Sequence, residues 1–232
     1  MSNKIDITFD FRTDSNGGDP DSKSPTLKRY HRLLWSKEVP SGGRLILDEK
    51  LNSISDIGEF YFGSDSIVHT FSSWEKYKHI IEKVDIEKIN EFKSLGYTIG
   101  GMLIFPRNKI NNCQTINMAR GCNQKIKDRI DLTLECIRRY YNKEESPLNK
   151  CFDKYKNFFD LFIDFKEYIN FFLLQDLVND KYDEIKYFHP FNNFDEDPLP
   201  KSVDEYLKYK SNVMEFVNKR NQRIINWVDK NI

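Results

Sequence analysis

The sequence lacks an excess of charge of either sign. Its 232 residues include 36 Lys and Arg residues against 36 Asp and Glu residues. Proteins that bind nucleic acids or membrane surfaces as a general function normally carry a basic excess, so the balance argues against both classes. A basic patch confined to one part of the surface is still compatible with the total, and a nucleic-acid-processing enzyme therefore stays as an alternative.

Long apolar segments are also missing. No uninterrupted apolar run approaches the roughly 20 residues that a membrane-spanning helix needs. The opening residues, MSNKIDITFDF, contain no basic region, apolar core or cleavage site of a secretory signal. We therefore expect a cytoplasmic protein that does not associate with membranes.

Motifs for metals and nucleotides are absent as well. Cys113, Cys122, Cys136 and Cys151 form no CxxC pair and no zinc spacing, and the four histidines form no HExxH motif or close pair. No G-x-G-x-x-G or Walker loop is present. The sequence thus predicts free thiols in a reducing compartment, assigns no metal and leaves any cofactor unknown.

Aromatic residues, by contrast, are plentiful, with 18 Phe and 12 Tyr, and a chain of this length can bury an aromatic-rich core. Short apolar or alternating segments predict strands at residues 5–11, 45–47, 59–62, 67–71 and 97–105, with 114–117 as the partner of the last. The later residues are almost wholly helical in pattern. We predict a single α+β domain over 1–232, in which a small mixed or antiparallel sheet in the first half (1–117) packs against a mainly helical second half (118–232).

Several helix boundaries carry local signals. Ser24 followed by Pro25 predicts a helix start, and Ser202 with Glu205 forms a capping box before a last long helix. A further helix over 86–95 should end at Gly96. These signals depend on neighbouring residues only.

The stretch 117–141 is interpreted as one central helix. Its apolar residues are spaced by three or four and predict a buried stripe, formed by Ile126, Ile130, Leu134, Ile137 and Tyr141. Asp131, Glu135 and Arg138 share another face of this helix, with Asp128 one turn earlier.

The chain also resembles a bacterial family of uncharacterised proteins, defined only as a domain of unknown function. The resemblance covers nearly the whole chain. It is carried by the segments DFRTDSNGGDPD, SPTLKRYHRLLWSK, TINMARG, DLTLECIRRYY and FFLLQDLV. It implies a single-domain bacterial protein and no particular activity.

Asn117 and Arg120 precede Gly121 at the expected start of the central helix. Backbone N–H groups at a helix start attract anions, and a guanidinium binds phosphate or carboxylate through two hydrogen bonds. We interpret Asn117 and Arg120 as binding residues for an anionic small molecule or a nucleotide. The structural alternative is that Arg120 pairs with a carboxylate such as Asp128 or Asp131 and orders the loop.

Asp131 and Glu135, one turn apart, are candidate general acid and base, and Arg138 is a candidate ligand-binding residue beside them. Oxygen ligands of this kind also suit Mg²⁺, although no metal is assigned here. The alternative is a solvated helix face, since acid–Arg pairs three or four residues apart stabilise helices by themselves.

Three further residues complete the candidate site. Asp10 and Arg12 alternate with the apolar residues of the first predicted strand and are candidate ligand-binding residues, unless they only form turns or protect a sheet edge. His69 lies on a predicted strand near Ser66 and Thr70 and is the best candidate general base, although a packed or surface role is more common for a histidine.

Together these residues suggest a cytoplasmic enzyme or sensor with a polar cleft for an anionic or nucleotide-like ligand. The rival is a non-catalytic protein-interaction module whose Arg and Asp residues are structural. One observation separates the two hypotheses. Arg12, Arg120 and Arg138 converge on solvent in the first, whereas in the second each pairs with a carboxylate of the protein.

Overall fold

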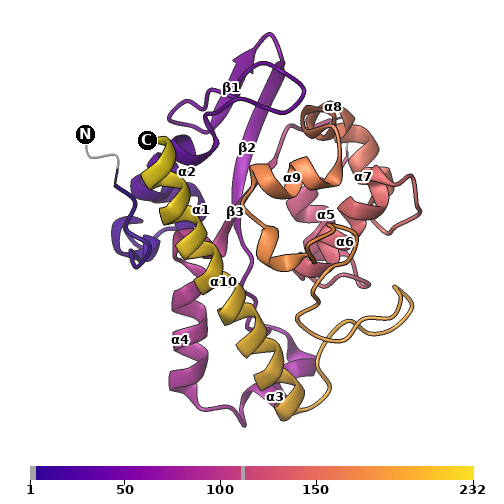
Figure 1. Cartoon of the computed structure of the whole chain (residues 1–232). Coiled ribbons are helices and arrows are strands. Elements are labelled where there is room, and N and C mark those ends of the chain that lie inside the picture. Colours follow the sequence, from indigo (N-terminus) through magenta and orange to yellow (C-terminus); the bar gives the residue numbers. More distant parts are fainter. Residues whose placement is uncertain (1–3, 111–112) are drawn as a thin grey trace.

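Strands β1 (Asn52–Ser55), β2 (Gly58–Ser66) and β3 (Met102–Pro106) form an antiparallel sheet in the order β1-β2-β3. Within it, Ser66 of β2 pairs with Met102 of β3. The computed structural model describes residues 4–110 and 113–232. All five residues of β3 are buried, because α10 and the second half of the chain lie beside this strand (Figure 1). The predicted α+β class, with a small sheet in the first half, is confirmed.

Short helices surround the sheet in the first half of the chain. They are η1 (Phe11–Asp14), α1 (Pro20–Lys23), α2 (Pro25–Trp35), η2 (Glu75–Tyr77), α3 (Lys78–Ile81), α4 (Ile86–Gly96) and η3 (Ile99–Gly101). Ser24 caps α2 as predicted, since its Oγ accepts a hydrogen bond of 3.0 Å from the backbone N–H of Leu27. The helix predicted over 86–95 is α4.

The second half is helical throughout its regular structure. It contains α5 (Ile116–Cys122), α6 (Ile130–Tyr141), α7 (Asn149–Phe152), η4 (Asp153–Tyr155), α8 (Lys156–Phe159), η5 (Asp160–Phe162), α9 (Phe165–Phe171), η6 (Gln175–Leu177) and α10 (Val203–Asn231). Ser202 caps α10 through a 3.2 Å hydrogen bond from the N–H of Glu205, as predicted. In Figure 1, α10 runs back across the molecule, and its final residues lie near the N-terminal segment.

Aromatic side chains join the two halves. The ring of Phe158, on α8, lies 6.3 Å from that of Phe60 and 5.9 Å from that of Phe62, both on β2. On its other sides it meets the rings of Phe162 and Phe172 at 5.2 and 6.3 Å. The buried apolar residues of both halves thus form one connected core.

Side chains of helix α10 form hydrogen bonds with backbone groups at the start of β3 and just before it. Asn221 Oδ1 accepts a 2.7 Å hydrogen bond from the N–H of Gly100, and the buried Arg220 donates to the carbonyls of Gly100, Met102 and Phe172 at 2.9, 2.7 and 3.2 Å. A Cβ at position 100 would lie 2.5 Å from Asn221 Oδ1. Only glycine therefore permits this approach.

Several predicted strands are wrong. Residues 5–11 form turns that lead into η1, because Asp6 accepts a hydrogen bond from the N–H of Thr8 and Asp10 accepts one from the N–H of Arg12. Such local side-chain bonds replace strand pairing. Residues 45–47 and 67–71 are irregular, 97–101 form a turn and η3 before the strand begins at Met102, and 114–117 lead into α5.

The central stretch is two helices instead of one. Thr115 caps α5, and residues 123–129 form a loop in which Lys127 and Asp128 have left-handed φ angles of 52° and 63°. Arg120 and Gly121 therefore lie inside α5, and Asp128 lies in the loop before α6. Four members of the predicted apolar stripe are confirmed as buried, since Ile130, Leu134, Ile137 and the loop residue Ile126 are each 0% exposed, whereas the last member, Tyr141, is only half-buried.

Candidate functional site

A cavity of about 340 Å³ opens beside the end of β2, between α4 and the loop before α6. Its wall combines hydroxyl groups, aromatic rings and charged groups. The lining residues are Ser66, Val68, His69, Thr70, Phe71, Ser72, Ser73, Trp74, Lys93, Tyr97 and Asp128. We call this space the His69 cavity.

Behind the cavity lies Arg120, whose side chain is completely buried. Its Nη1 lies 2.5 Å from Oδ2 of Asp65 and 3.0 Å from Oδ1 of Asp128. Its Nε donates to Thr133 Oγ1 at 3.2 Å, and Nη2 donates to the carbonyl of Asp128 at 2.9 Å. The guanidinium is thus engaged on every nitrogen by the protein, and its role at the cavity is to hold the two carboxylates.

His69 contacts the same group of charges from the cavity side. Its Nε2 lies 3.2 Å from Oδ2 of Asp128, and the two side chains are 24% and 19% exposed. The contact is not aligned as a hydrogen bond, and among the described residues this buried nitrogen has no aligned partner. A ring that faces a carboxylate in a partly open cavity is positioned for proton transfer.

The cluster holds more carboxyl groups than nearby cations can neutralise. Burial raises the pKa of Asp65, an effect that Arg120 opposes and Asp128 reinforces. Burial, with smaller contributions from Asp65 and Asp19, raises the pKa of Asp21 on α1 to about 7. The pKa of Asp21 thus lies near neutral pH, although this carboxyl does not itself line the His69 cavity.

The structure places Asp131 and Glu135 elsewhere. Asp131 is fully buried, pairs with the buried Arg129 at 3.1 Å and accepts a 2.9 Å hydrogen bond from the N–H of Phe188. Glu135 lies 2.9 Å from Arg138 and 2.6 Å from Arg139. Although burial acts to raise the pKa of Glu135, these hydrogen bonds lower it overall. Neither carboxylate lines the His69 cavity.

The remaining predicted residues are also held by the protein. Arg12 pairs with Asp10 and donates to Ser94 Oγ at 2.8 Å, and its guanidinium lies 4.9 Å from the centre of the Tyr97 ring. Asn117 donates to the carbonyl of Ser64 at 3.4 Å.

Arg12, Arg120 and Arg138 thus each have a carboxylate partner, and the three do not converge on one cavity. Of the predicted site residues, the structure brings together His69 and Arg120, which are joined through Asp128.

Sequence reasoning missed Asp65, Asp21 and Lys93. Asp65 lies in GSDS, which reads as a turn, yet it alternates along β2 with the buried Phe62 and so projects from the opposite face. The one signal for Asp65 in the sequence was its position as a single acidic residue within a segment that forms a strand. Nothing in the sequence indicated that α1 and α4 would supply the other two residues.

Within residues 4–110 and 113–232, no group of three or more His, Cys, Asp or Glu side chains is arranged to hold a metal ion. None of the helices in the described part of the chain is long and apolar enough to cross a membrane.

Comparison with known proteins gives a family and no activity. The chain matches no curated protein and no solved structure. Residues 5–224 match the model of one family, which confirms the resemblance inferred from the sequence. The chain therefore belongs to the Family of unknown function (DUF6994).

Proposed function

We propose that this protein is a cytoplasmic enzyme that transfers a proton to or from a small anionic molecule bound in the His69 cavity. The observation that carries the proposal is the 3.2 Å contact between His69 Nε2 and Asp128 Oδ2 at the wall of that cavity. His69 is the proposed general base.

The support for His69 is the chain of groups behind it. Asp128 contacts the ring, and the buried Arg120 holds Asp128 through both a side-chain and a backbone contact. A base oriented by a second group, which is itself held by a third, is a recurring arrangement in enzymes. Because Nε2 faces Asp128, Nδ1 is the ring nitrogen assigned to the ligand.

The support for an anionic ligand is Lys93. This side chain lines the cavity, is exposed, and has no carboxylate partner within 4.0 Å among the residues that the structure describes. The hydroxyl groups of Ser72 and Ser73 line the cavity nearby, and the rings of Trp74 and Tyr97 offer flat surfaces. Phosphate monoesters, carboxylates and nucleotides are therefore the ligands to test first.

The experiment combines binding with turnover. Thermal shift and calorimetry with a panel of these anions would identify ligands, and ¹H NMR in D₂O would report deuterium uptake or product formation. We expect His69→Asn to keep binding while turnover falls about 10²–10⁴-fold, the usual contribution of a general base. Lys93→Ala should weaken binding instead.

Matched controls are available on the surface. His79→Asn and Lys88→Ala change exposed residues of the same types outside the cavity, and both should behave as the wild type. Binding without turnover in the wild type would identify a sensor. If no anion in the panel binds, or if His69→Asn turns over at the wild-type rate, the proposal is wrong.

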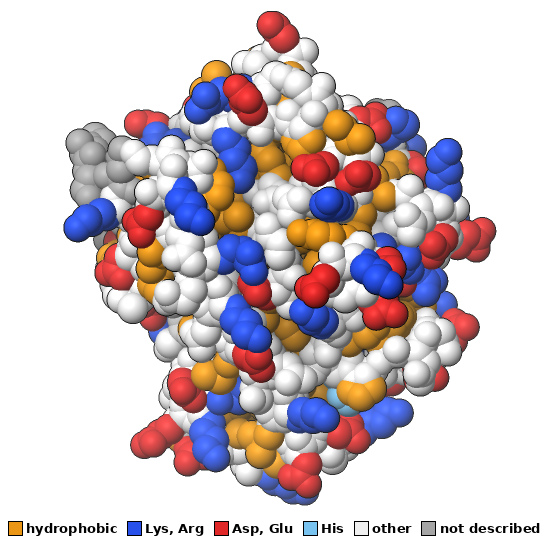
Figure 2. Space-filling view, in the orientation of Figure 1, with side chains coloured by type: hydrophobic (Ala, Val, Ile, Leu, Met, Phe, Trp, Pro, Cys, Tyr) orange, Lys and Arg blue, Asp and Glu red, His pale blue; other side chains and the backbone are white. Residues whose placement is uncertain are grey.

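A second candidate is the non-catalytic interaction module. The observation in its favour is that Arg12, Arg120 and Arg138 are each paired with a carboxylate of the protein. A nucleic-acid-processing role has less support, because basic and acidic side chains are interspersed over the face shown in Figure 2. An anion that binds at Lys93 and is turned over through His69 would exclude the module as the main function.

A further inference from the structure

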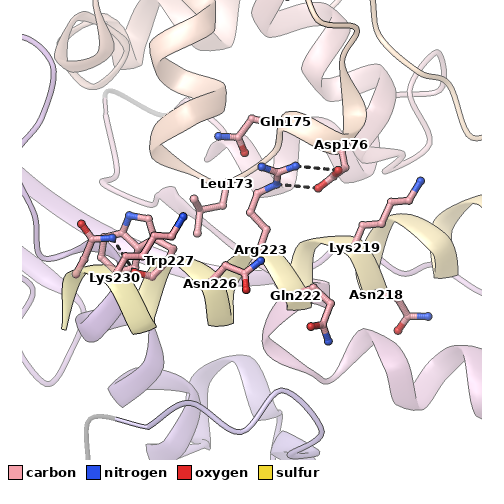
Figure 3. Close-up of a pocket in the computed structure, with 11 residues that line it drawn as sticks. Leu173, Gln175, Asp176, Asn218, Lys219, Gln222, Arg223, Asn226, Trp227 and Lys230 are labelled. Carbon is pink, nitrogen blue, oxygen red and sulfur yellow. Dashed lines mark hydrogen bonds and ion pairs between the residues drawn. The ribbon is translucent and has the colours of Figure 1, made fainter.

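A second cavity lies along the C-terminal half of α10. It has a volume of about 680 Å³ and faces the segment that carries η6 (Figure 3). We call it the α10 groove. It shares no lining residue with the His69 cavity.

Trp227 supplies an aromatic surface at one end of this groove (Figure 3). The ammonium of Lys37 lies over the indole, 4.6 Å from the ring centre, and donates a 2.7 Å hydrogen bond to the carbonyl of Phe171. Lys37 also lies over the rings of Trp35 and Phe171, at 5.0 and 4.4 Å. The indole is therefore held in one orientation before any ligand arrives.

The charges of the groove leave a cation available beside Trp227. Arg223 is bound to Asp176 through two hydrogen bonds of 2.8 and 2.9 Å, and Lys219 pairs with Glu215. Lys230 is exposed and has no carboxylate within 4.0 Å among the described residues. It follows Trp227 by three residues, so the two side chains share one face of α10.

The wall opposite α10 contributes an unused acceptor. Gln175 donates through Nε2 to Asn170 Oδ1 at 3.1 Å, whereas its buried Oε1 has no hydrogen-bond partner in the described part of the chain. Leaving a buried acceptor without a partner costs free energy that a bound donor would recover. Beside it, Leu173 has a left-handed φ of 55° because it lies at the C-terminal end of α9, where the N–H of Leu174 donates a 3.0 Å hydrogen bond back to the carbonyl of Ile169.

We propose that the α10 groove binds a mononucleotide, with its base stacked on Trp227, a base N–H donated to Gln175 Oε1 once that amide turns toward the groove, and its phosphate at Lys230. Amide side chains of Asn218, Gln222 and Asn226 on α10 also line the groove and supply further polar groups for the base edge or ribose. The combination of a fixed aromatic ring, amides and one cation suits a base with a single phosphate.

Other ligands fit less well. Inorganic phosphate would use Lys230 and leave Trp227 and Gln175 without a role. A single-stranded nucleic acid needs a basic channel that follows its backbone, whereas two of the three cations in the groove are already paired with carboxylates.

Calorimetry with AMP, ribose 5-phosphate, inorganic phosphate and a short oligoadenylate tests the proposal. We expect AMP to bind more tightly than the other three. Trp227→Ala should weaken AMP binding at least about tenfold through lost base stacking. Trp227→Phe should keep part of the affinity, because an aromatic ring remains.

Lys230→Ala keeps the test valid if a Trp227 variant fails to fold, since Lys230 is exposed. It should weaken AMP binding but leave the weaker adenosine binding unchanged. Lys208→Ala, at an exposed position of the same helix outside the groove, should have no effect. Lys93→Ala, which should weaken binding in the His69 cavity, should leave AMP binding in the α10 groove unchanged, and this result separates the two sites.

Three results would overturn the proposal. They are no AMP binding to the wild type, equal AMP affinity of the wild type and Lys230→Ala, and tighter binding of the oligoadenylate than of AMP. The last would identify the groove as part of a single-strand-binding surface.

Discussion

Nη1 of Arg120 lies 2.5 Å from Oδ2 of Asp65, although 55 residues separate them in the chain. The contact joins α5 to β2 behind the His69 cavity. The Arg120 side chain is fully buried, and those of Asp65 and Asp128 are only 22% and 19% exposed, so the cluster behaves as a largely buried ion pair.

The first consequence is the effect of removing the guanidinium. Arg120→Ala would leave Asp65 and Asp128 without their cation, and losing one partner of a buried pair usually costs about 3–5 kcal/mol. The free energy of unfolding, measured in urea, should fall by that amount. Arg12→Ala is the matched control, because its pair with Asp10 is exposed and such pairs contribute about 0–1 kcal/mol. Equal losses in the two variants would contradict the structural role of Arg120.

The second prediction concerns the apolar stripe of α6. Leu134 is 0% exposed, and Leu134→Ala should lower the free energy of unfolding by about 2–5 kcal/mol through lost burial and a cavity. Denaturant unfolding measures this directly. A change below about 1 kcal/mol is typical of a surface position and would show that the stripe is not core.

The third prediction is a pH dependence caused by Asp21. Its carboxyl has a pKa of 3.8 when unperturbed and about 7 in the folded protein. Between these values the unfolded state releases the proton while the folded state keeps it, so the contribution of Asp21 to stability is greatest below pH 4 and is lost as the pH rises to 7. The slope from this one group is at most about 1.4 kcal/mol per pH unit.

Asp21→Asn removes that slope, so the stability difference between variant and wild type should shift in favour of the variant as the pH rises from 4 to 7. Thermal melts across this range measure it. Asp56→Asn, at an exposed position, serves as the control. A constant difference over the whole range would show that Asp21 does not hold its proton.

A fourth prediction concerns the thiols. All four cysteines are free in the structure, and burial raises the pKa of Cys136 and of Cys151 to about 12. Because the thiolate is the reactive form, these two should react slowly with a disulfide reagent in native protein, whereas the exposed Cys122 should react fast. Protein unfolded without reductant and protected from air should titrate four thiols. A disulfide found by mass spectrometry would contradict both this count and a reducing cytoplasm.

The parts of the fold that were predictable are those with local causes. Ser24 and Ser202 each cap the helix that follows within three residues, and the α6 stripe follows from spacing alone. The strand at 5–11 failed for an equally local reason, since Asp6 and Asp10 bind backbone N–H groups two residues ahead. Alternating apolar residues cannot show that a competing turn is more stable.

The candidate site was only partly predictable, because its contacts are remote in sequence. His69 and Arg120 were both singled out, but for different roles and without a link between them. The link is Asp128, which a single-helix interpretation placed beside Asp131. Two left-handed residues, Lys127 and Asp128, turn the chain there, and neither is a glycine that would have marked the turn.

The backbone contacts of α10 also bear on how the chain folds during synthesis. Arg220 and Asn221 bind backbone groups of Gly100 and Met102, which leave the ribosome about 120 residues earlier. At translation rates of about 5–20 residues per second, that delay is about 6–24 s. During this delay, the surface around Gly100 and Met102 that α10 later covers is exposed to water or bound by a chaperone. The first half of the nascent chain should therefore depend on chaperone binding until α10 emerges.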